Sequence, residues 1–363
     1  MPARKYLPLL IAVILLHGGV TWWFLGRTDP QPPPPSRDLA DLGQPPRWEE
    51  LARYDQVLPR PAFEQALDEV YTLEDWSDYF SLTNEEVSIR ASGGERVAVR
   101  FAAEGDPKPP ERYWRPAREL PPAPPDKPLA GLRIAIDPGH IGGDYAQIEE
   151  RWYRIGDGIA VTEGDMTLRT AKLLQTRLEA LGAVVTLVRT KPEPVTDQRP
   201  ADLLEFARQR RPSLSKAEQQ RFAERLFYRT AEIRARAALV NESIRPDLLL
   251  CVHFNAEAWD NPSNPTFSKV NHFHLILHGA YMPGELAHDD ERFEMLTKVF
   301  QQTHPEELAV SRKVAGAFTK RTSLLPYIYR TDAPAVRLGP ALYARNLLAN
   351  RLYRCPVIFL EPY

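Results

Sequence analysis

From Leu132 onward the sequence alternates short apolar runs with amphipathic stretches, and this alternation constrains the fold more than any other feature. The apolar runs predict strands at 132–136, 184–188, 248–254, 272–277 and 356–360. Apolar residues at steps of three and four predict helices at 166–181, 217–244 and 308–318. Strands that alternate with helices are typical of an α/β domain with a mostly parallel central sheet flanked by helices.

Proline divides the rest of the chain. The sequence has 35 prolines among 363 residues, and they cluster at 30–46 and 107–128. Proline fixes φ and lacks a backbone donor, so such stretches form stiff, extended spacers. We therefore predict five parts in chain order. They are an N-terminal segment at 1–27, a first linker at 28–46, a small module at 47–104, a second linker at 105–130 and a large domain at 131–363. The formal net charge of -2 provides no electrostatic footprint for nucleic acid, so no nucleic-acid partner is expected.

The N-terminal segment has the pattern of a membrane anchor. Arg4 and Lys5 precede an apolar run at 7–25, which is long enough to cross a bilayer core of about 30 Å as a helix. Basic residues at its start favour a cytoplasmic N-terminus. We expect a transmembrane helix that places everything beyond Arg27 outside the cytoplasm, in the periplasm. Secretion after signal-peptide cleavage is the alternative, although no small-x-small cleavage site follows the run.

The small module at 47–104 has mixed α+β character. Helical patterns occur at 48–54 and 61–71, and strand-like patterns at 87–89 and 97–101. It contains no cluster of metal ligands and no paired nucleophile and base. We interpret it as a packing, spacing or wall-contact element.

Side chains with metal-binding chemistry follow the predicted strands. His140, His253 and Glu361 each come directly after a strand, and Glu163 precedes the first helix. Chemistry in open α/β sheets gathers outside the carboxyl ends of the strands, so these four side chains are expected to converge. His and Glu suit zinc, and three protein ligands leave a fourth position open for water. Taken singly, a His at a strand end is more often a capping residue, and a Glu at a helix start often serves the helix dipole.

Six segments occur in one order along the chain: Ile134–Gly143, Glu163–Leu168, Leu187–Thr190, Arg236–Asn241, Cys251–Ala256 and Val357–Glu361. Together they resemble the zinc N-acetylmuramoyl-L-alanine amidases, the family of the bacterial cell-separation amidases. The resemblance covers about Leu132 to Tyr363. It implies that His140, Glu163 and His253 bind one Zn²⁺ per chain and that Glu361 is the catalytic acid/base. It also implies the substrate bond, which is the amide that joins N-acetylmuramic acid to L-alanine in peptidoglycan.

The sequence departs from the family pattern in four places. Ile141 interrupts the glycine run after His140, and two insertions occur at Lys191–Arg225 and Gly284–His304. The second insertion is our candidate for a lid over the active site. The family normally continues past the catalytic Glu with another helix, so a truncation at Tyr363 is left open.

Roles for some residues stay open in the sequence. Asn255 and Arg236 either fix the site or hold substrate. A second histidine group, formed by His272, His274 and His278, shares one strand face and is an alternative metal site. A protein activator is also left open.

Two other functions fit the same pattern. One is a catalytically inactive wall-binding protein with an amidase fold, and the other is a zinc peptidase that cuts within the stem peptide. If the chain is a hydrolase, we expect the part from about Pro107 onward to carry the activity, because no chemical constellation precedes it.

Overall fold

The computed structural model describes residues 39–256, 266–329 and 333–363. Within those ranges, no helix is both long enough and apolar enough to span a membrane. The predicted anchor at 1–27 and most of the first linker at 28–46 lie outside the described residues. The anchor therefore stays a prediction.

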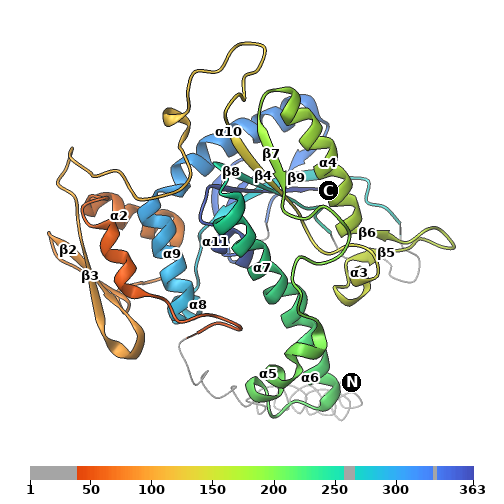
Figure 1. Ribbon diagram of the computed structural model, residues 1–363, viewed down its shortest axis with the longest axis horizontal. Coiled ribbons are helices and arrows are strands. Elements are labelled where there is room, and N and C mark those ends of the chain that lie inside the picture. Colours follow the sequence, from red (N-terminus) through yellow and green to blue (C-terminus); the bar gives the residue numbers. More distant parts are fainter. Residues whose placement is uncertain (1–38, 257–265, 330–332) are drawn as a thin grey trace, which may run out of the picture.

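In the described residues, eight strands form the central sheet (Figure 1). Their order is β11-β12-β9-β13-β8-β4-β7, and β10 pairs with β9 beside this path. The bounds are β4 Arg133–Pro138, β7 Val184–Leu187, β8 Leu248–Val252, β9 His272–His278, β10 Leu325–Pro326, β11 Val336–Gly339, β12 Leu342–Arg345 and β13 Val357–Pro362. The five predicted strands correspond to β4, β7, β8, β9 and β13, which are consecutive in the sheet from β9 to the edge strand β7.

The sheet is mixed rather than purely parallel. Strands β7, β4, β8 and β13 are parallel to one another, and so are β10, β9 and β12. The two groups meet where β13 pairs antiparallel with β9, and β11 reverses again against β12. The predicted mostly parallel sheet is therefore confirmed only in part. The reversal places the start of β9 beside the carboxyl end of β13, where Glu361 pairs with His274.

Helices α4 (Glu163–Ala180) and α10 (Thr303–Arg321) cover one face of the sheet. Both extend predicted helices by several residues. Alternate residues of the strands supply the core beneath them: Ile134, Ile136, Val185 and Leu187 under α4, and Phe273, Leu275, Leu342 and Ile358 under α10.

The opposite face is covered by α7 (Glu232–Ala238) and α11 (Leu348–Leu352). The strand residues in this second core are Ala135, Leu249, Cys251, Ile276, Val357 and Phe359. Side chains alternate between the two faces of a strand, so Asp137, His253 and Glu361 continue the rows on this face. The side chains of Asp137, His253 and Glu361 therefore lie on the face of the sheet that α7 covers.

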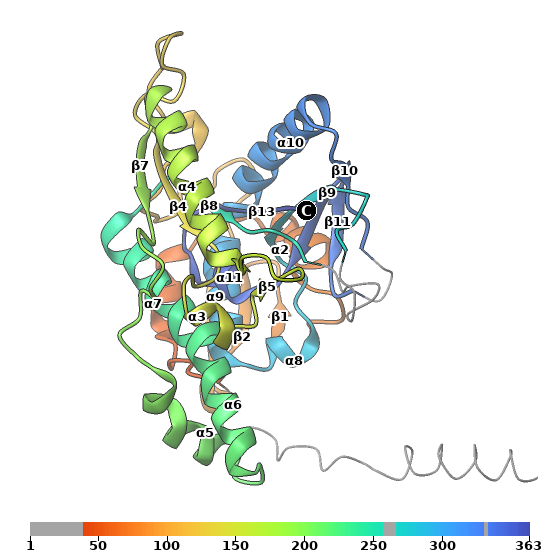
Figure 2. The same ribbon diagram turned by 90° about the vertical axis from the view of Figure 1, so that its right-hand side faces the viewer.

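A long helix runs from Lys216 to Ile244 and leads away from the sheet (Figure 2). It consists of α6 (216–226), α7 (232–238) and two π-helical segments at 227–231 and 239–244, and it confirms the predicted helix at 217–244. A 3₁₀ turn, Pro200–Leu203, and α5 (Leu204–Arg210) pack against α6. The insertion at Lys191–Arg225 thus builds a helical arm beyond the sheet.

The module at 47–104 contains the elements expected from its pattern. A 3₁₀ helix at Trp48–Tyr54 and α2 (Arg60–Ala66), which continues as one π-helical turn to Tyr71, accompany an antiparallel sheet. The strands of that sheet are β1 Phe80–Leu82, β2 Glu86–Arg90 and β3 Arg96–Arg100.

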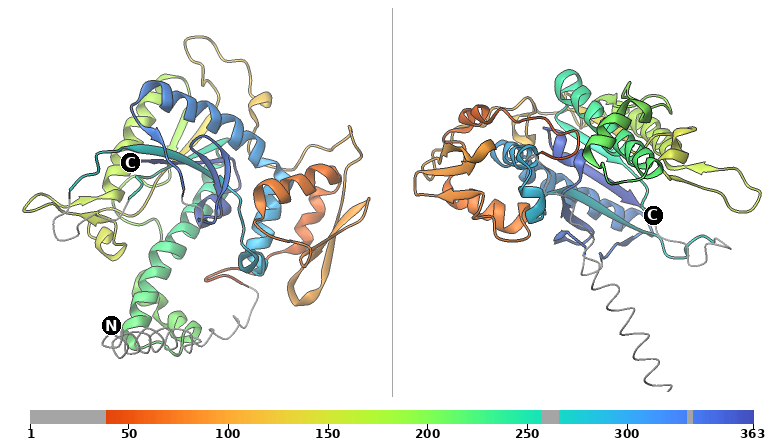
Figure 3. Two further views of the ribbon diagram at one scale, coloured as in Figure 1. Left: turned by 180° about the vertical axis from the view of Figure 1, so that it is seen from behind. Right: turned by 90° about the horizontal axis from the view of Figure 1, so that it is seen from below.

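This module lies beside α9 (Asp289–Gln301), which follows the short α8 (Pro283–Leu286) (Figure 3). The two parts share one apolar core, to which α9 contributes Met295, Leu296, Val299 and Phe300, all of them buried. The lid predicted at Gly284–His304 is therefore wrong, because the apolar face of this segment is covered by the module instead of facing the candidate site.

The second proline-rich linker is fixed to the large domain. Trp114 is buried in the α7-side core. The guanidinium groups of Arg115 and Arg133 each lie 2.6 Å from an oxygen of Asp247. Burial opposes ionisation of Asp247, but the hydrogen bonds from both arginines outweigh it and hold the pKa of this carboxyl well below its ordinary value.

Candidate metal centre

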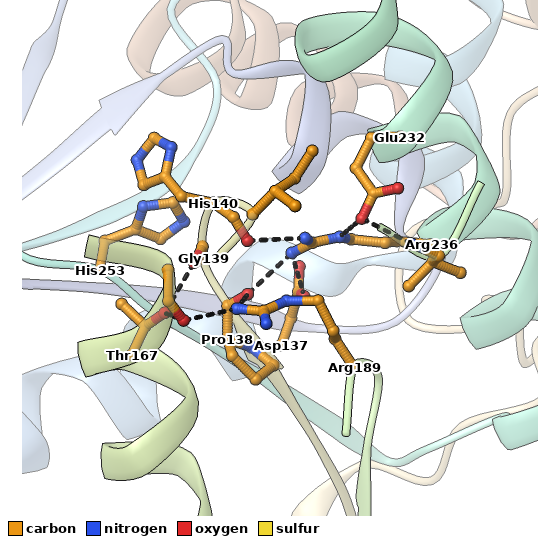
Figure 4. Close-up of polar contacts among 12 residues, drawn as sticks. Asp137, Pro138, Gly139, His140, Thr167, Arg189, Glu232, Arg236 and His253 are labelled. Carbon is orange, nitrogen blue, oxygen red and sulfur yellow. Dashed lines mark hydrogen bonds and ion pairs between the residues drawn. The ribbon is translucent and has the colours of Figure 1, made fainter. Parts of the chain in front are cut away.

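The loop after β4 holds His140 in a fixed backbone conformation (Figure 4). A Cβ atom at Gly139 would lie 2.3 Å from the ring of His253, so only glycine fits there. His140 has a φ of 58°, in the left-handed region that costs energy for a residue with a side chain. Its carbonyl oxygen accepts a hydrogen bond from Arg236 Nη2 at 2.8 Å, and Thr167 Oγ1 donates to the carbonyl of Gly139 at 2.7 Å.

The structure brings His140, Glu163 and His253 together. Glu163 Oε1 lies 3.4 Å from His140 Nε2 and 3.6 Å from His253 Nδ1. All three potential ligand atoms lie within 4.8 Å of one another. Glu163 is the first residue of α4, and its Oε1 also accepts a hydrogen bond from the backbone of Phe254 at 2.9 Å. The donor set and spacing suit a single tetrahedral metal ion with one open position.

Glu149 orients His140, and sequence reasoning missed it. It follows α3 (Tyr145–Ile148), and its Oε1 lies 2.7 Å from His140 Nδ1. Its Oε2 accepts a hydrogen bond from the backbone N–H of Ile141 at 2.8 Å. With Nδ1 engaged, Nε2 is the nitrogen that remains for a metal. A carboxylate behind a ligating imidazole is the usual support of a zinc-bound histidine.

The pKa values of the two imidazoles move in opposite directions. Burial lowers the pKa of His140, which favours the neutral imidazole that binds metal. Burial also opposes ionisation of His253, but hydrogen bonding to Glu163 outweighs it and raises the pKa. The Glu163 carboxylate thus stabilises a positive charge on the neighbouring group, here the His253 imidazole.

Arg236 contacts the loop that carries His140, and it lies to the right of that loop in Figure 4. Its Nη1 donates to Asp137 Oδ1 and to the carbonyl of Pro138, both at 2.8 Å, and its Nε donates to Glu232 Oε1 at 2.7 Å. With Nη2 bound to His140 as well, the guanidinium is committed to four acceptors. Of its two predicted roles, the contacts favour fixing the site over holding substrate.

Glu361 lies at the end of β13, on the same strand face as Phe359. The ring of Phe359 stacks on His253 with centroids 4.5 Å apart. Burial raises the pKa of Glu361 to about 7, against the lowering effect of His253 and two arginines. The carboxyl therefore lies near His253 and Glu163, whose charges act on it, and its pKa is close to neutral pH.

Sequence comparison decides the family. A profile of the N-acetylmuramoyl-L-alanine amidases matches residues 134–325, which is more than half of the chain. This chain belongs to the N-acetylmuramoyl-L-alanine amidase family. Among individual relatives, the probable cell wall amidase LytH of Staphylococcus aureus is 43% identical over 63 residues. That segment is 17% of this chain and 20% of LytH, so the match spans about a fifth of the relative's length.

Solved amidase structures align over 64% of this chain. The apo form of Ami1 from Mycobacterium abscessus is 17% identical, with 84% of its chain covered and a TM-score of 0.32. CwlD from Clostridioides difficile, in complex with the GerS lipoprotein, is 13% identical, with 81% covered and a TM-score of 0.35. AmiC2 of Nostoc punctiforme is 15% identical, with 81% covered and a TM-score of 0.31.

The alternative metal site of this amidase-family chain is not formed. His272, His274 and His278 are buried, and in the part of the chain that the structure describes the metal-ligand group is His140, Glu163 and His253. His274 Nε2 lies 3.0 Å from the hydroxyl of Tyr329, and His278 Nε2 lies 2.8 Å from that of Tyr281. Burial lowers the pKa of His274 to about 4. His274 and His278 pack as buried side chains in contact with tyrosine rings, and the ring of His272 stacks on that of Tyr363.

Two cavities adjoin the three ligands. The first, about 220 Å³, contains His140 and His253 and is bordered by charged residues of the long helix, such as Arg229 and Glu232. The second, about 250 Å³, contains Glu163 and Asn255. Both are lined by Glu150 and Arg151, so the two cavities share a wall beside the candidate metal site.

Proposed function

We propose that this chain is a zinc-dependent hydrolase that cleaves the amide bond between N-acetylmuramic acid and L-alanine in peptidoglycan. The observation that carries the proposal is the convergence of His140, Glu163 and His253 beside Glu361 in a chain of the amidase family. Glu361 lies outside the segment that matches the family profile, so its role rests on its position.

The residues present fit zinc. Two imidazoles and one carboxylate are a frequent ligand set of catalytic zinc, and the hydrogen bond that Nδ1 of His140 donates to Glu149 leaves Nε2 directed at Glu163. A zinc ion held there supplies Lewis-acid chemistry, since it lowers the pKa of water and polarises a carbonyl group.

The remaining chemistry belongs to the chain's own side chains. Glu361 removes a proton from the attacking water and returns it to the leaving nitrogen of L-alanine. Its buried position suits this exchange, because desolvation raises the pKa of Glu361 to about 7, close to neutral pH. Arg236 and Glu149 hold the His140 loop in place throughout.

The cellular setting follows from the N-terminal sequence. We propose that the segment at 1–27 anchors the protein in the cell membrane and that the candidate site faces peptidoglycan outside the cytoplasm. Secretion after cleavage of this segment would deliver the same domain to the same substrate.

Digestion of purified peptidoglycan with and without metal tests the proposal. Full-length protein loaded with one equivalent of zinc should release soluble fragments. The same protein after chelation should release none, and it should recover on adding zinc. Peptidoglycan that is bound but never cut by the zinc-loaded protein would indicate an inactive wall-binding protein.

A further inference from the structure

The cavity beside Glu163 has a lining that the hydrolytic chemistry does not use. Apart from Glu163 itself, the residues around it include Arg151, Trp152, Met166 and Asn255. Trp152 belongs to β5 (Trp152–Tyr153), which pairs with β6 (Val161–Thr162) as a hairpin that projects from the sheet (Figure 1). The cavity therefore has one wall on the hairpin and one on the metal site.

Backbone hydrogen bonds fix this cavity relative to the metal ligands. Trp152 pairs with Thr162, the residue directly before Glu163. On the other wall, the N–H of Phe254 donates to Glu163 and the N–H of Asn255 donates to the carbonyl of Pro362 at 2.9 Å. A ligand seated here would lie at a set distance from the site of bond cleavage.

Three side chains around the cavity are available to a ligand. Trp152 is 43% exposed. The Arg151 guanidinium has a single ion pair within the described residues, to Glu163 at 4.0 Å, and makes no side-chain hydrogen bond there. Among the residues that the structure describes, Asn255 is hydrogen-bonded through its backbone N–H, and its side-chain amide lines the cavity without a partner.

This combination is suited to a sugar. A pyranose ring presents a face of C–H groups, which packs against an exposed indole, and a rim of hydroxyl and amide groups, which needs planar donors and acceptors. Asn supplies both a donor and an acceptor, and Arg supplies donors. At about 250 Å³ the cavity is smaller than the ~300–1,000 Å³ of sites for drug-sized ligands, which favours a single ring.

We propose that this cavity is a saccharide subsite that holds the N-acetylmuramic acid ring of the substrate against Trp152. The inference rests on the proposed amidase function, and it specifies in which orientation the substrate lies across the metal site. The glycan lies on the hairpin side of Glu163, and the stem peptide lies in the other cavity, beside Arg229 and the long helix.

Binding measurements with the two halves of the substrate test this direction. The full-length zinc-loaded protein would be titrated in a calorimeter with the disaccharide of N-acetylglucosamine and N-acetylmuramic acid, and separately with a stem peptide that begins with L-alanine. Trp152→Ala should weaken disaccharide binding by about tenfold, or about 1.4 kcal/mol, and leave peptide binding unchanged. Trp152→Phe, which keeps an aromatic face, should recover most of the affinity.

Ile159→Ala is the matched control, because Ile159 lies on the same hairpin, is 90% exposed and does not line the cavity. It should bind both ligands as the unchanged protein does. Thermal melting of each variant shows whether a lost affinity comes from lost folding. Asn255→Ala changes the opposite wall of the cavity and should also weaken disaccharide binding.

Two results would overturn the inference. The first is that Trp152→Ala weakens the peptide instead of the disaccharide, and the second is that the unchanged protein does not bind the disaccharide. Failure of the proposed function looks different, because a protein that binds the disaccharide through Trp152 but cuts no peptidoglycan retains the subsite without the hydrolysis.

Discussion

The Nδ1 atom of His140 lies 2.7 Å from Oε1 of Glu149, so one candidate zinc ligand is held in orientation by a buried carboxylate. The same carboxylate accepts the backbone N–H of Ile141 and thereby fixes the loop that carries the ligand. This pairing accounts for the orientation of the site and leads to the first prediction.

Glu149→Ala should weaken zinc binding by about 10- to 100-fold, because an unsupported imidazole is a poorer and less ordered ligand. The dissociation constant is measured by competition with a chromophoric chelator. Glu150→Ala removes the same charge one residue away, where the side chain is exposed, and should bind zinc nearly as tightly as the unchanged chain. Equal affinities for the two variants would show that Glu149 does not support the ligand.

Removal of a ligand should abolish stoichiometric zinc. We expect His140→Ala and His253→Ala to lose the metal, since each takes one of three donor atoms from the group. His274→Ala should keep one zinc per chain, because the His274 ring contacts Tyr327 and Tyr329 and is not part of the ligand group. Metal content by mass spectrometry that followed His272 and His274 instead would refute the assignment.

Glu361→Gln should keep both zinc and fold but lower turnover by about 10²-fold or more, the usual scale for loss of general acid/base help. An amide has nearly the shape of the carboxyl group but cannot exchange the proton. Zinc content and turnover are measured on one preparation. Full activity would remove Glu361 from the mechanism, and loss of zinc would make it a ligand.

Asp247→Asn should destabilise the fold by about 2 kcal/mol, because it weakens charged hydrogen bonds from two partly exposed arginines. The folded pKa of Asp247 is depressed, so its contribution is present above its ordinary pKa of about 4 and is lost as pH falls below it. Denaturant titrations at pH 7 and pH 3 measure how much the free energy of unfolding falls with pH. This fall should be smaller for Asp247→Asn than for the unchanged protein. Asp78 is exposed, and Asp78→Asn is the control. It should change neither the stability at pH 7 nor the loss of stability between pH 7 and pH 3.

The part of the chain from about Pro107 onward is still expected to carry the activity, but deletion of residues 1–106 should destabilise this domain. The module and α9 bury each other's apolar side chains, so its removal exposes Met295, Leu296, Val299 and Phe300. Deletion of 1–38 leaves this core intact and should preserve the melting temperature. A soluble, active fragment that starts at Pro107 would contradict this.

Much of the sheet was predictable because its strands are buried apolar runs separated by helices. The reversal at β9 also had a signal, since a parallel connection requires a long crossover and no helix was predicted between 254 and 272. That β13 is the strand which pairs with β9 could not be predicted from either strand, because partners far apart in sequence leave no local pattern. The two-residue strands β5 and β6 were too short for any periodicity.

The candidate ligands were predictable because each follows a strand or begins a helix, where side chains meet at one edge. Glu149 was not, because it follows a four-residue helix and acts through another side chain. The lid prediction at Gly284–His304 failed for a similar reason. The apolar face of α9 was visible in the sequence, but its partner lies some two hundred residues earlier in the chain.

The most direct test of the central claim is mass spectrometry of the products released from purified peptidoglycan by the full-length, zinc-loaded protein. The account predicts intact stem peptides that begin with a free L-alanine amino group, together with glycan strands whose lactyl groups carry free carboxylates. Glu361→Gln should reduce both products in parallel. Peptides cut within the stem, with L-alanine still attached to the sugar, would contradict it and identify the protein as a zinc peptidase of different specificity.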